Sequence, residues 1–269
     1  MPRPSLSPAF RTVPLAHRAL HDRAAGRPEN SLSAVRAAVA AGYGIEIDLQ
    51  LSQDGEAMVF HDATLSRVAR ARGSVGARTA AALGRIALRR STHGDTIPTL
   101  SEVLQEVAGK VPLLIEVKDQ ADGGSGVGVG PLEAATARAL ADWDNAADWV
   151  AVMSFNPGSV AAMATAAPAI PRGLTTWAWP RVRTPRLRAR LRDQLRSIEA
   201  FDDLSASFVS HDVADLDRPR LADLRAQGAA ILCWTVRSAR VEARARRYAH
   251  NITFEGYLPV TSGPAFAAT

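Results

Sequence analysis

Short apolar runs alternate with amphipathic segments along most of the chain. The runs have the length of strands, and the segments between them repeat apolar residues at helical spacing. Eight runs are predicted as strands: Val13–His17, Gly44–Leu51, Pro112–Val117, Trp149–Ser154, Arg172–Thr176, Ser207–Ser210, Ala230–Val236 and Ile252–Gly256. Helices are predicted between them near residues 31–41, 99–109, 131–142, 157–166, 185–199, 218–227 and 238–249. Strand–helix alternation of this length predicts a single (β/α)8 TIM barrel of the α/β class.

One apolar segment, Ala57–Asp62, interrupts this alternation. The linker that joins it to the second strand contains Asp54-Gly55 and is too short for a crossover helix. Asp-Gly is a strong hairpin signal, so we predict that the segment returns antiparallel to the second strand. Residues 63–98 are then predicted as a small insertion within one domain that spans residues 1–269, and the glycine-rich stretch 123–130 as a loop.

The composition agrees with one large folded core. The chain has 269 residues and a 47% apolar fraction, and its only cysteine, Cys233, excludes an internal disulfide. No stretch approaches the ~20 consecutive apolar residues of a membrane span. The first residues also lack the apolar region of a secretory signal. We therefore expect a cytoplasmic protein without stable membrane insertion.

The net charge of +5 raises the question of a nucleic-acid partner. The most basic segment, residues 181–196, carries Leu187, Leu191 and Leu195 at a spacing of four, which predicts an amphipathic helix with a solvated basic face. No aromatic residues are interleaved with its arginines, as single-strand binding would favour. We expect no nucleic-acid partner, and the sequence does not determine an oligomeric state.

Charged residues recur where the early strands end, in a recognisable order. The order is His17-Arg18-Ala19, Pro28-Glu29-Asn30-Ser31, Glu46-Ile47-Asp48 and His61-Asp62, followed by Ile97–Lys118 with its Pro-Thr-Leu and Ile-Glu-Val-Lys groups. This set resembles the glycerophosphodiester phosphodiesterase family. Two departures stand out: Ala19 replaces a glycine, and Ile252–Tyr257 lacks the family's Gly-Ile-x-Thr-Asp run.

Three carboxylates are candidates for a metal site. Glu46 and Asp48 are two apart on one strand, so their side chains share a face, and Glu116 has the same strand-end context. Carboxylates inside apolar strands need a compensating cation, and oxygen ligands suit Mg²⁺ or Ca²⁺. The resemblance assigns all three positions to one divalent metal ion; the alternative is ion pairing with barrel arginines.

The remaining charged residues suggest acid/base chemistry on a phosphate. His17 and His61 are candidates for general acid and base, because imidazole changes charge near neutral pH. Arg18 and Lys118 suit a phosphate, Arg18 through paired hydrogen bonds and Lys118 as a point charge. A lone histidine at a strand end is more often structural, but two beside a carboxylate cluster favour catalysis.

Phe155, His211 and Trp234 are weaker candidates, because they lie at or near strand ends and could line a pocket for the alcohol. Large aromatics are more often core residues, and a solvated loop histidine is an equal alternative for His211.

The resemblance implies metal-dependent hydrolysis of a small glycerophosphodiester to glycerol 3-phosphate and an alcohol, through a cyclic phosphate. Two alternatives stay open. One is a phospholipase-type phosphodiesterase acting on lysophospholipids or sphingolipids, and the other is a barrel that binds phosphodiesters without turnover.

Overall fold

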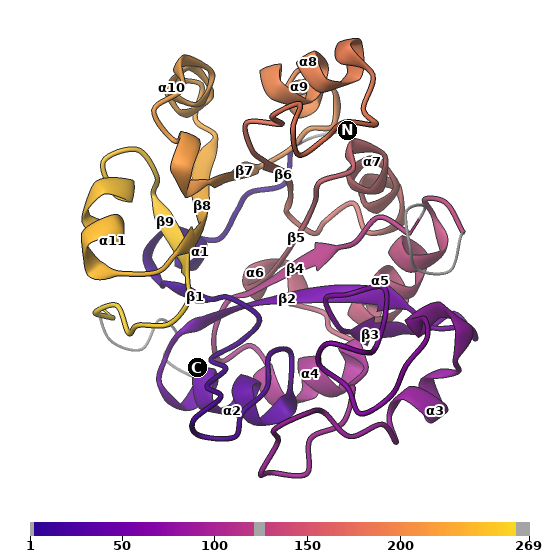
Figure 1. Ribbon diagram of the computed structural model, residues 1–269. Coiled ribbons are helices and arrows are strands. Elements are labelled where there is room, and N and C mark those ends of the chain that lie inside the picture. Colours follow the sequence, from indigo (N-terminus) through magenta and orange to yellow (C-terminus); the bar gives the residue numbers. More distant parts are fainter. Residues whose placement is uncertain (1–2, 121–126, 262–269) are drawn as a thin grey trace.

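The computed structural model describes residues 3–120 and 127–261. Eight parallel strands close into a barrel, because β1 pairs with both β2 and β9 (Figure 1). A ninth strand, β3, extends the sheet beside β2. The strands are β1 (Leu15–Ala16), β2 (Gly44–Leu51), β3 (Ala57–Val59), β4 (Leu113–Val117), β5 (Val150–Ser154), β6 (Arg172–Thr176), β7 (Phe208–Asp212), β8 (Ala230–Val236) and β9 (Asn251–Phe254). The predicted (β/α)8 barrel is confirmed.

Helices surround the strands (Figure 1). They are α1 (Ala9–Thr12), α2 (Leu32–Ala40), α3 (Ala80–Leu83), α4 (Leu100–Val107), α5 (Pro131–Ala141), α6 (Ala146–Trp149), α7 (Pro157–Ala166), α8 (Ala189–Ser197), α9 (Ala200–Asp203), α10 (Pro219–Ala226) and α11 (Ala239–Ala245), with 3-10 turns η1 (Val75–Ala77) and η2 (Val213–Asp215). Each predicted helix has a counterpart. Four residues of the predicted 123–130 loop, 123–126, lie outside the described residues.

Element boundaries differ from the predicted ones where local conformation stops an element. β1 is shorter than predicted at both ends, because Val13 is the C-cap of α1, and Arg18 and Ala19 turn the chain in the left-handed region just beyond the strand. Trp149 ends α6 instead of starting β5. The predicted helix 185–199 is reduced to α8, whose C-cap Ile198 is left-handed, and α9 follows it.

The segment after β2 returns antiparallel, as predicted. In the register of β2 and β3, Val59 lies opposite Leu49. Beyond β3 the pairing continues, because the Phe60 amide donates to the Asp48 carbonyl over 2.9 Å. The hairpin therefore places Phe60 opposite Asp48 and His61 directly after it, although these residues are distant from Asp48 along the chain.

Residues 63–98 form a compact insertion next to this hairpin. They contribute a small hydrophobic cluster of their own, which is continuous with the hairpin through Met58 and Phe60. The cluster also contains Leu65, Val68, Ala69, Val75, Leu83, Leu88 and Ile97. Burial of these side chains fixes the insertion against the strand that carries His61.

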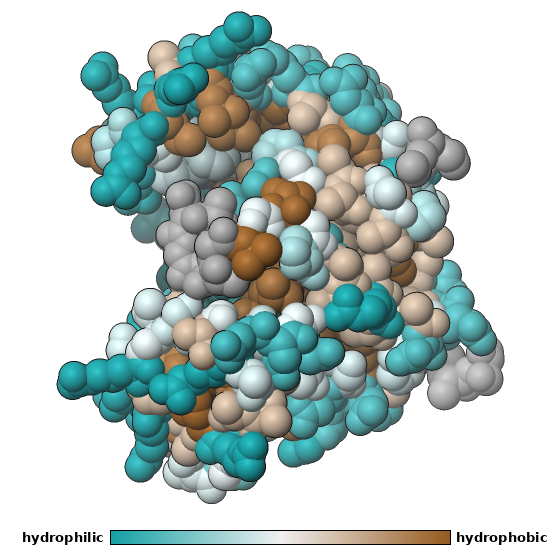
Figure 2. All heavy atoms as spheres, turned by 90° about the vertical axis from the view of Figure 1, so that its right-hand side faces the viewer, coloured by the Kyte–Doolittle hydropathy of each residue, from teal (hydrophilic) through white to brown (hydrophobic). Residues whose placement is uncertain are grey.

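On the face shown in Figure 2, polar side chains cover the upper and lower edges, and hydrophobic side chains form small groups at the upper left, in the middle and at the lower left. The predicted amphipathic basic segment forms α8, none of whose residues is fully buried. Within the described residues, no helix has both the length and the apolar character needed to cross a bilayer.

One buried glycine marks a tight contact between barrel strands. A Cβ on Gly173 of β6 would lie 2.4 Å from the ring of Phe208 on β7. Both strands are held in the sheet on either side, so neither can move away freely. We expect Gly173→Ala to lower the free energy of unfolding by ~1–3 kcal/mol, as overpacked cores do.

Urea unfolding measures this effect. Gly128→Ala is the matched control, because a Cβ there would meet no atom within 4 Å. Equal stability of the two variants would show that the β6–β7 contact can relax.

Candidate active site

A pocket of about 320 Å³ opens where the carboxyl ends of the barrel strands meet. The structure brings nine of the ten predicted site residues to its lining: His17, Arg18, Glu46, Asp48, His61, Glu116, Lys118, Phe155 and Trp234. These residues come from β2, β4, β8 and from the segments that follow β1, β3, β4 and β5. Barrel closure therefore gathers side chains that are spread over most of the sequence.

Glu46, Asp48 and Glu116 form a buried cluster of carboxylates. Asp48 pairs with Glu116 in the register of β2 and β4, and Glu46 lies two residues before Asp48 on the same side of β2. The three side chains offer oxygens that lie within 4.8 Å of one another. The residues are only 2%, 1% and 6% exposed. A set of oxygen donors this close fits a hard divalent cation.

The electrostatics of the cluster show a shortage of positive charge at Glu46. Burial, and next the charge of Asp48, raise the pKa of Glu46 to about 7. Burial would also raise the pKa of Asp48, but Lys118, His61 and Arg18 hold it below its ordinary range. Asp48 is thus compensated by side-chain cations, whereas the Glu46 carboxylate accepts one hydrogen bond within the described residues, from the backbone N–H of Arg18 over 2.9 Å. A divalent ion between the carboxylates would supply the missing charge.

Lys118 lies against the same cluster. Its ammonium contacts Asp48 over 2.7 Å and also pairs with Glu116. Burial would lower the pKa of Lys118, but Asp48 and Glu116 raise it well above its ordinary value. Lys118 is therefore a permanent cation at the pocket.

His17 is held through one ring nitrogen. Its Nδ1 lies 3.2 Å from Oε2 of Glu255, which follows β9, and Glu255 also binds Arg237 over 2.8 Å. The hydrogen bond from His17 is the largest of the effects that lower the pKa of Glu255 to about 2. Among the described residues, nothing bonds the Nε2 atom of His17, so that nitrogen is available to a ligand.

His61 is held in the same manner from the other side of the pocket. Its Nδ1 lies 2.6 Å from Oδ1 of Asp62, and Arg67 of the insertion binds the other oxygen of Asp62 over 2.6 Å. Burial lowers the pKa of His61, although the charge of Asp48 opposes this. The described residues again leave Nε2 without a partner. Two imidazoles, each oriented by a carboxylate, therefore face one pocket.

The turn after β1 builds the wall between these groups. Arg18 and Ala19 have φ of 54° and 64°, a conformation that favours glycine, which agrees with the glycine that the family has at position 19. In this turn the Arg18 guanidinium bonds Glu29 over 2.9 Å and lies 3.5 Å from Asp48. Asn30 donates to Asp48 over 2.9 Å instead of capping α2, and Ser31 is the cap.

The three weaker candidates differ in their placement. Phe155 and Trp234 both line the pocket, and their rings meet edge to face with centroids 5.5 Å apart. His211 does not join them. It is fully buried on β7, and its ring nitrogens lie 2.6 Å from Thr176 Oγ1 and 3.3 Å from Asp215 Oδ2. The strand turns His211 into the barrel wall, away from the loop position that the sequence suggested.

Sequence reasoning missed several residues of the pocket. In the sequence Glu255 is only part of a departure from the family pattern, yet it orients His17. Asp62 and Arg67 form the corresponding support for His61. Arg183 and Arg237 add cationic side chains to the lining. An acid at the end of the last strand was a usable signal for Glu255, because the first and last strands of a closed barrel are neighbours.

The pairing of His17 with Glu255 makes stability depend on pH. The pKa of Glu255 falls from an ordinary value of 4.5 to about 2, so its stabilising contribution is complete above pH 4.5 and is lost as the pH falls towards 2. We expect Glu255→Gln to reduce the free energy of unfolding at pH 6, and this difference from the wild type to shrink between pH 4.5 and 2.

Urea unfolding at several pH values measures this difference, with the exposed Glu56→Gln as the control. A destabilisation by Glu255→Gln that is the same at every pH would contradict the charge pairing.

Comparisons with known proteins agree on one family. Residues 17–251 match the glycerophosphoryl diester phosphodiesterase family. YhdW of Bacillus subtilis (strain 168) is 28% identical over 235 residues, which cover 86% of this chain and 88% of YhdW. The glycerophosphodiester phosphodiesterase of Caldanaerobacter subterraneus subsp. tengcongensis is 32% identical over 172 residues, which cover 61% of this chain and 67% of that enzyme.

Solved structures share the fold. A phosphodiesterase of Oleispira antarctica, in complex with the product sn-glycerol-3-phosphate, superposes with a TM-score of 0.73 at 23% identity, over 90% of this chain and 92% of that one. A glycerophosphodiester phosphodiesterase of Agrobacterium tumefaciens str. C58 gives 0.68 at 21% identity, over 90% and 96%. The family match covers most of the chain and includes both histidines and all three clustered carboxylates, so this chain belongs to the glycerophosphoryl diester phosphodiesterase family.

Proposed function

We propose that this protein hydrolyses glycerophosphodiesters to glycerol 3-phosphate and an alcohol, with a divalent metal ion and two-histidine acid/base catalysis. One observation carries the proposal: two imidazoles, each with Nδ1 on a carboxylate and Nε2 unpartnered among the described residues, line the same pocket as three buried carboxylates. Membership of the family supports it.

Glu46, Asp48 and Glu116 would hold the ion, and the oxygen donors suit Mg²⁺ or Ca²⁺. When bound, a divalent ion makes a coordinated hydroxyl more acidic and offsets negative charge on phosphate. Lys118 and Arg18 add fixed positive charge beside the cluster, which favours binding of the phosphodiester anion. Arg18 is kept in place by Glu29, so its guanidinium loses little freedom when the anion binds.

The two histidines would move the protons. The glycerol hydroxyl next to the phosphodiester attacks phosphorus, and one histidine accepts its proton at Nε2. The bond from phosphorus to the alcohol oxygen breaks, and the other histidine donates a proton to that oxygen. Water then opens the resulting cyclic phosphate to glycerol 3-phosphate. Glu255 and Asp62 each bind Nδ1 of a ring, which leaves Nε2 facing the pocket, with a lone pair on the histidine that acts as the base and a proton on the one that acts as the acid.

The alcohol would lie against Phe155 and Trp234. Their edge-to-face contact forms an apolar wall of the pocket. The indole is held in place because Trp234 Nε1 donates a hydrogen bond to the Ser210 carbonyl over 3.1 Å. A rigid aromatic wall binds the non-reacting part of a small substrate at low entropic cost.

Release of glycerol 3-phosphate from glycerophosphocholine tests the proposal. We expect turnover in the presence of Mg²⁺ or Ca²⁺, detected by an enzyme-coupled assay for glycerol 3-phosphate. Protein that binds glycerophosphocholine but releases no product with either ion would point to the phosphodiester-binding alternative. Turnover of lysophospholipids alone would point to the phospholipase alternative.

A further inference from the structure

A second pocket lies outside the catalytic one and is strongly basic. It is a recess of about 480 Å³ between the loop after β1 and the 63–98 insertion. Five arginines line it, with Glu29 as the acid: Arg23, Arg67, Arg70, Arg89 and Arg90. None of the three clustered carboxylates and neither catalytic histidine is part of this lining. The phosphodiester chemistry proposed above therefore does not account for the recess.

The positive charge in the recess is not balanced by the protein. Arg67 binds Glu29 over 2.7 Å and Asp62 over 2.6 Å, so its charge is already compensated. Glu29 in turn is shared with Arg18 of the catalytic pocket. Within the described residues, no carboxylate pairs with Arg23, Arg70, Arg89 or Arg90. The recess is thus lined by uncompensated guanidinium groups, and its one carboxylate, Glu29, is already paired with Arg18 and Arg67.

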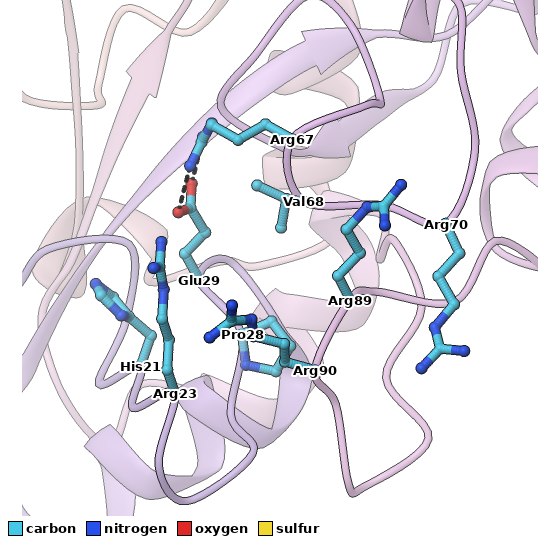
Figure 3. Close-up of a pocket in the computed structure, with 9 residues that line it drawn as sticks. All are labelled: His21, Arg23, Pro28, Glu29, Arg67, Val68, Arg70, Arg89 and Arg90. Carbon is cyan, nitrogen blue, oxygen red and sulfur yellow. Dashed lines mark hydrogen bonds and ion pairs between the residues drawn. The ribbon is translucent and has the colours of Figure 1, made fainter.

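The guanidinium groups are also arranged to meet a ligand. In Figure 3 the side chains of Arg23 and Arg90 extend to the same side of the recess as Arg67 and Glu29, whereas Arg70 and Arg89 extend to the other side. Arg90 adopts a left-handed backbone conformation, φ 65°, which is uncommon for a residue with a side chain. Charge repulsion disfavours placing Arg23 and Arg90 on the same side as Arg67, and an anion that binds between these three guanidinium groups would offset that repulsion.

The two walls of the recess are fixed to each other. The Thr92 amide donates to the Gly26 carbonyl over 3.1 Å, and a Cβ at Gly26 would lie 2.1 Å from Thr92. Asp95 of the insertion accepts the amide and hydroxyl of Ser33 on α2, over 3.0 and 2.8 Å. The recess therefore exists before a ligand arrives, and binding does not have to order its walls.

We propose that this recess binds a small, multiply charged phosphate anion, as a site separate from the catalytic pocket. Guanidinium groups bind phosphate oxygens through paired hydrogen bonds. Arg23 and Arg90 on one side of the recess, with the charges of Arg70 and Arg89 on the other, match a polyvalent anion better than a single carboxylate. The apolar part of the lining is confined to Pro28 and Val68, which disfavours a ligand with a hydrocarbon chain.

Inorganic pyrophosphate is the probe, titrated calorimetrically into the whole protein in excess EDTA. EDTA removes the divalent cations that would hold pyrophosphate at the carboxylate cluster, and the measurement does not depend on turnover. Competition by glycerophosphocholine then reports any binding in the catalytic pocket. The test variant is Arg23→Gln/Arg90→Gln, which leaves Arg67 and its support of Asp62 intact. The control is Arg240→Gln/Arg244→Gln, which removes two exposed charges on α11, outside the recess.

We expect one pyrophosphate per chain, an affinity at least tenfold weaker in the Arg23→Gln/Arg90→Gln variant, and an unchanged affinity in the control. Excess glycerophosphocholine, whose single phosphate is the reacting diester, should leave the titration unchanged. Equal weakening in both variants would show non-specific charge attraction and overturn the proposal. Unchanged binding in the test variant, or competition by glycerophosphocholine, would also overturn it. Circular dichroism melting confirms that each variant is folded.

Discussion

His61→Ala should lower kcat for glycerophosphocholine by ~10²–10⁴-fold, the range expected when one proton-transfer group is lost. His61 reaches the pocket only because the hairpin of β2 and β3 turns back, and its side chain is half-buried at the end of that hairpin. Its removal leaves the hydrophobic cluster of the insertion intact, so we expect a folded protein. His17→Ala should have an effect of the same order.

Two controls separate catalysis from folding. His93→Ala removes an exposed histidine of the insertion and should keep the wild-type rate. A p-nitrophenyl ester of glycerol phosphate needs no proton on its leaving group. The variant that lacks the general acid should therefore turn over this substrate at close to the wild-type rate. The variant that lacks the base should not. A folded His61→Ala protein with the wild-type rate would remove His61 from the mechanism.

Removal of divalent cations should reduce turnover to background, and added Mg²⁺ or Ca²⁺ should restore it. The reason is electrostatic: three carboxylates lie within 4.8 Å of one another, and burial with the charge of Asp48 raises the pKa of Glu46 to about 7. A cluster short of positive charge would repel the substrate anion. Glu46→Gln and Glu116→Gln should each weaken binding of the metal ion and so raise the metal concentration needed for half-maximal activity at least tenfold.

The measurement is turnover against free metal concentration, after dialysis against EDTA. Glu56→Gln, at an exposed position of the β2–β3 turn, is the matched control and should activate as the wild type does. Full activity of the demetallated protein in excess EDTA would exclude the proposed role of the carboxylates.

The sequence was sufficient to predict the barrel, because each strand and helix carries its own hydrophobic period and the linkers leave few ways to connect them. It was also sufficient for the hairpin, since the linker around Asp54-Gly55 excludes a crossover. The antiparallel register then places Phe60 opposite Asp48, and His61 follows it. Glu46, Asp48 and Glu116 were predictable for the same reason. Parallel strands bring their carboxyl ends to one edge, and residues two apart share a face.

Boundaries and side-chain partners were not predictable in this way. His211 sits at a strand end in the sequence, yet the register of β7 turns it into the wall, where Thr176 and Asp215 bind its ring. β1 is shorter than its apolar run, because Val13 already caps α1 and the left-handed turn at Arg18, whose amide binds Glu46, follows the strand. Such choices depend on neighbours that the local pattern does not contain.

The sequence by itself therefore determined the barrel and the end of it at which the charged side chains gather. Only the tertiary structure decided which side chains hold the two histidines in place. Barrel closure brings Glu255 to His17 across 238 positions, and packing of the insertion brings Arg67 to Asp62 and Glu29. The same packing forms the arginine-lined recess between the loop after β1 and the insertion, whose contact the hydrophobic pattern of the sequence does not predict. The physical reason is that local periodicity fixes elements, whereas ion pairs and pockets depend on distances between elements that are set only when the whole core packs.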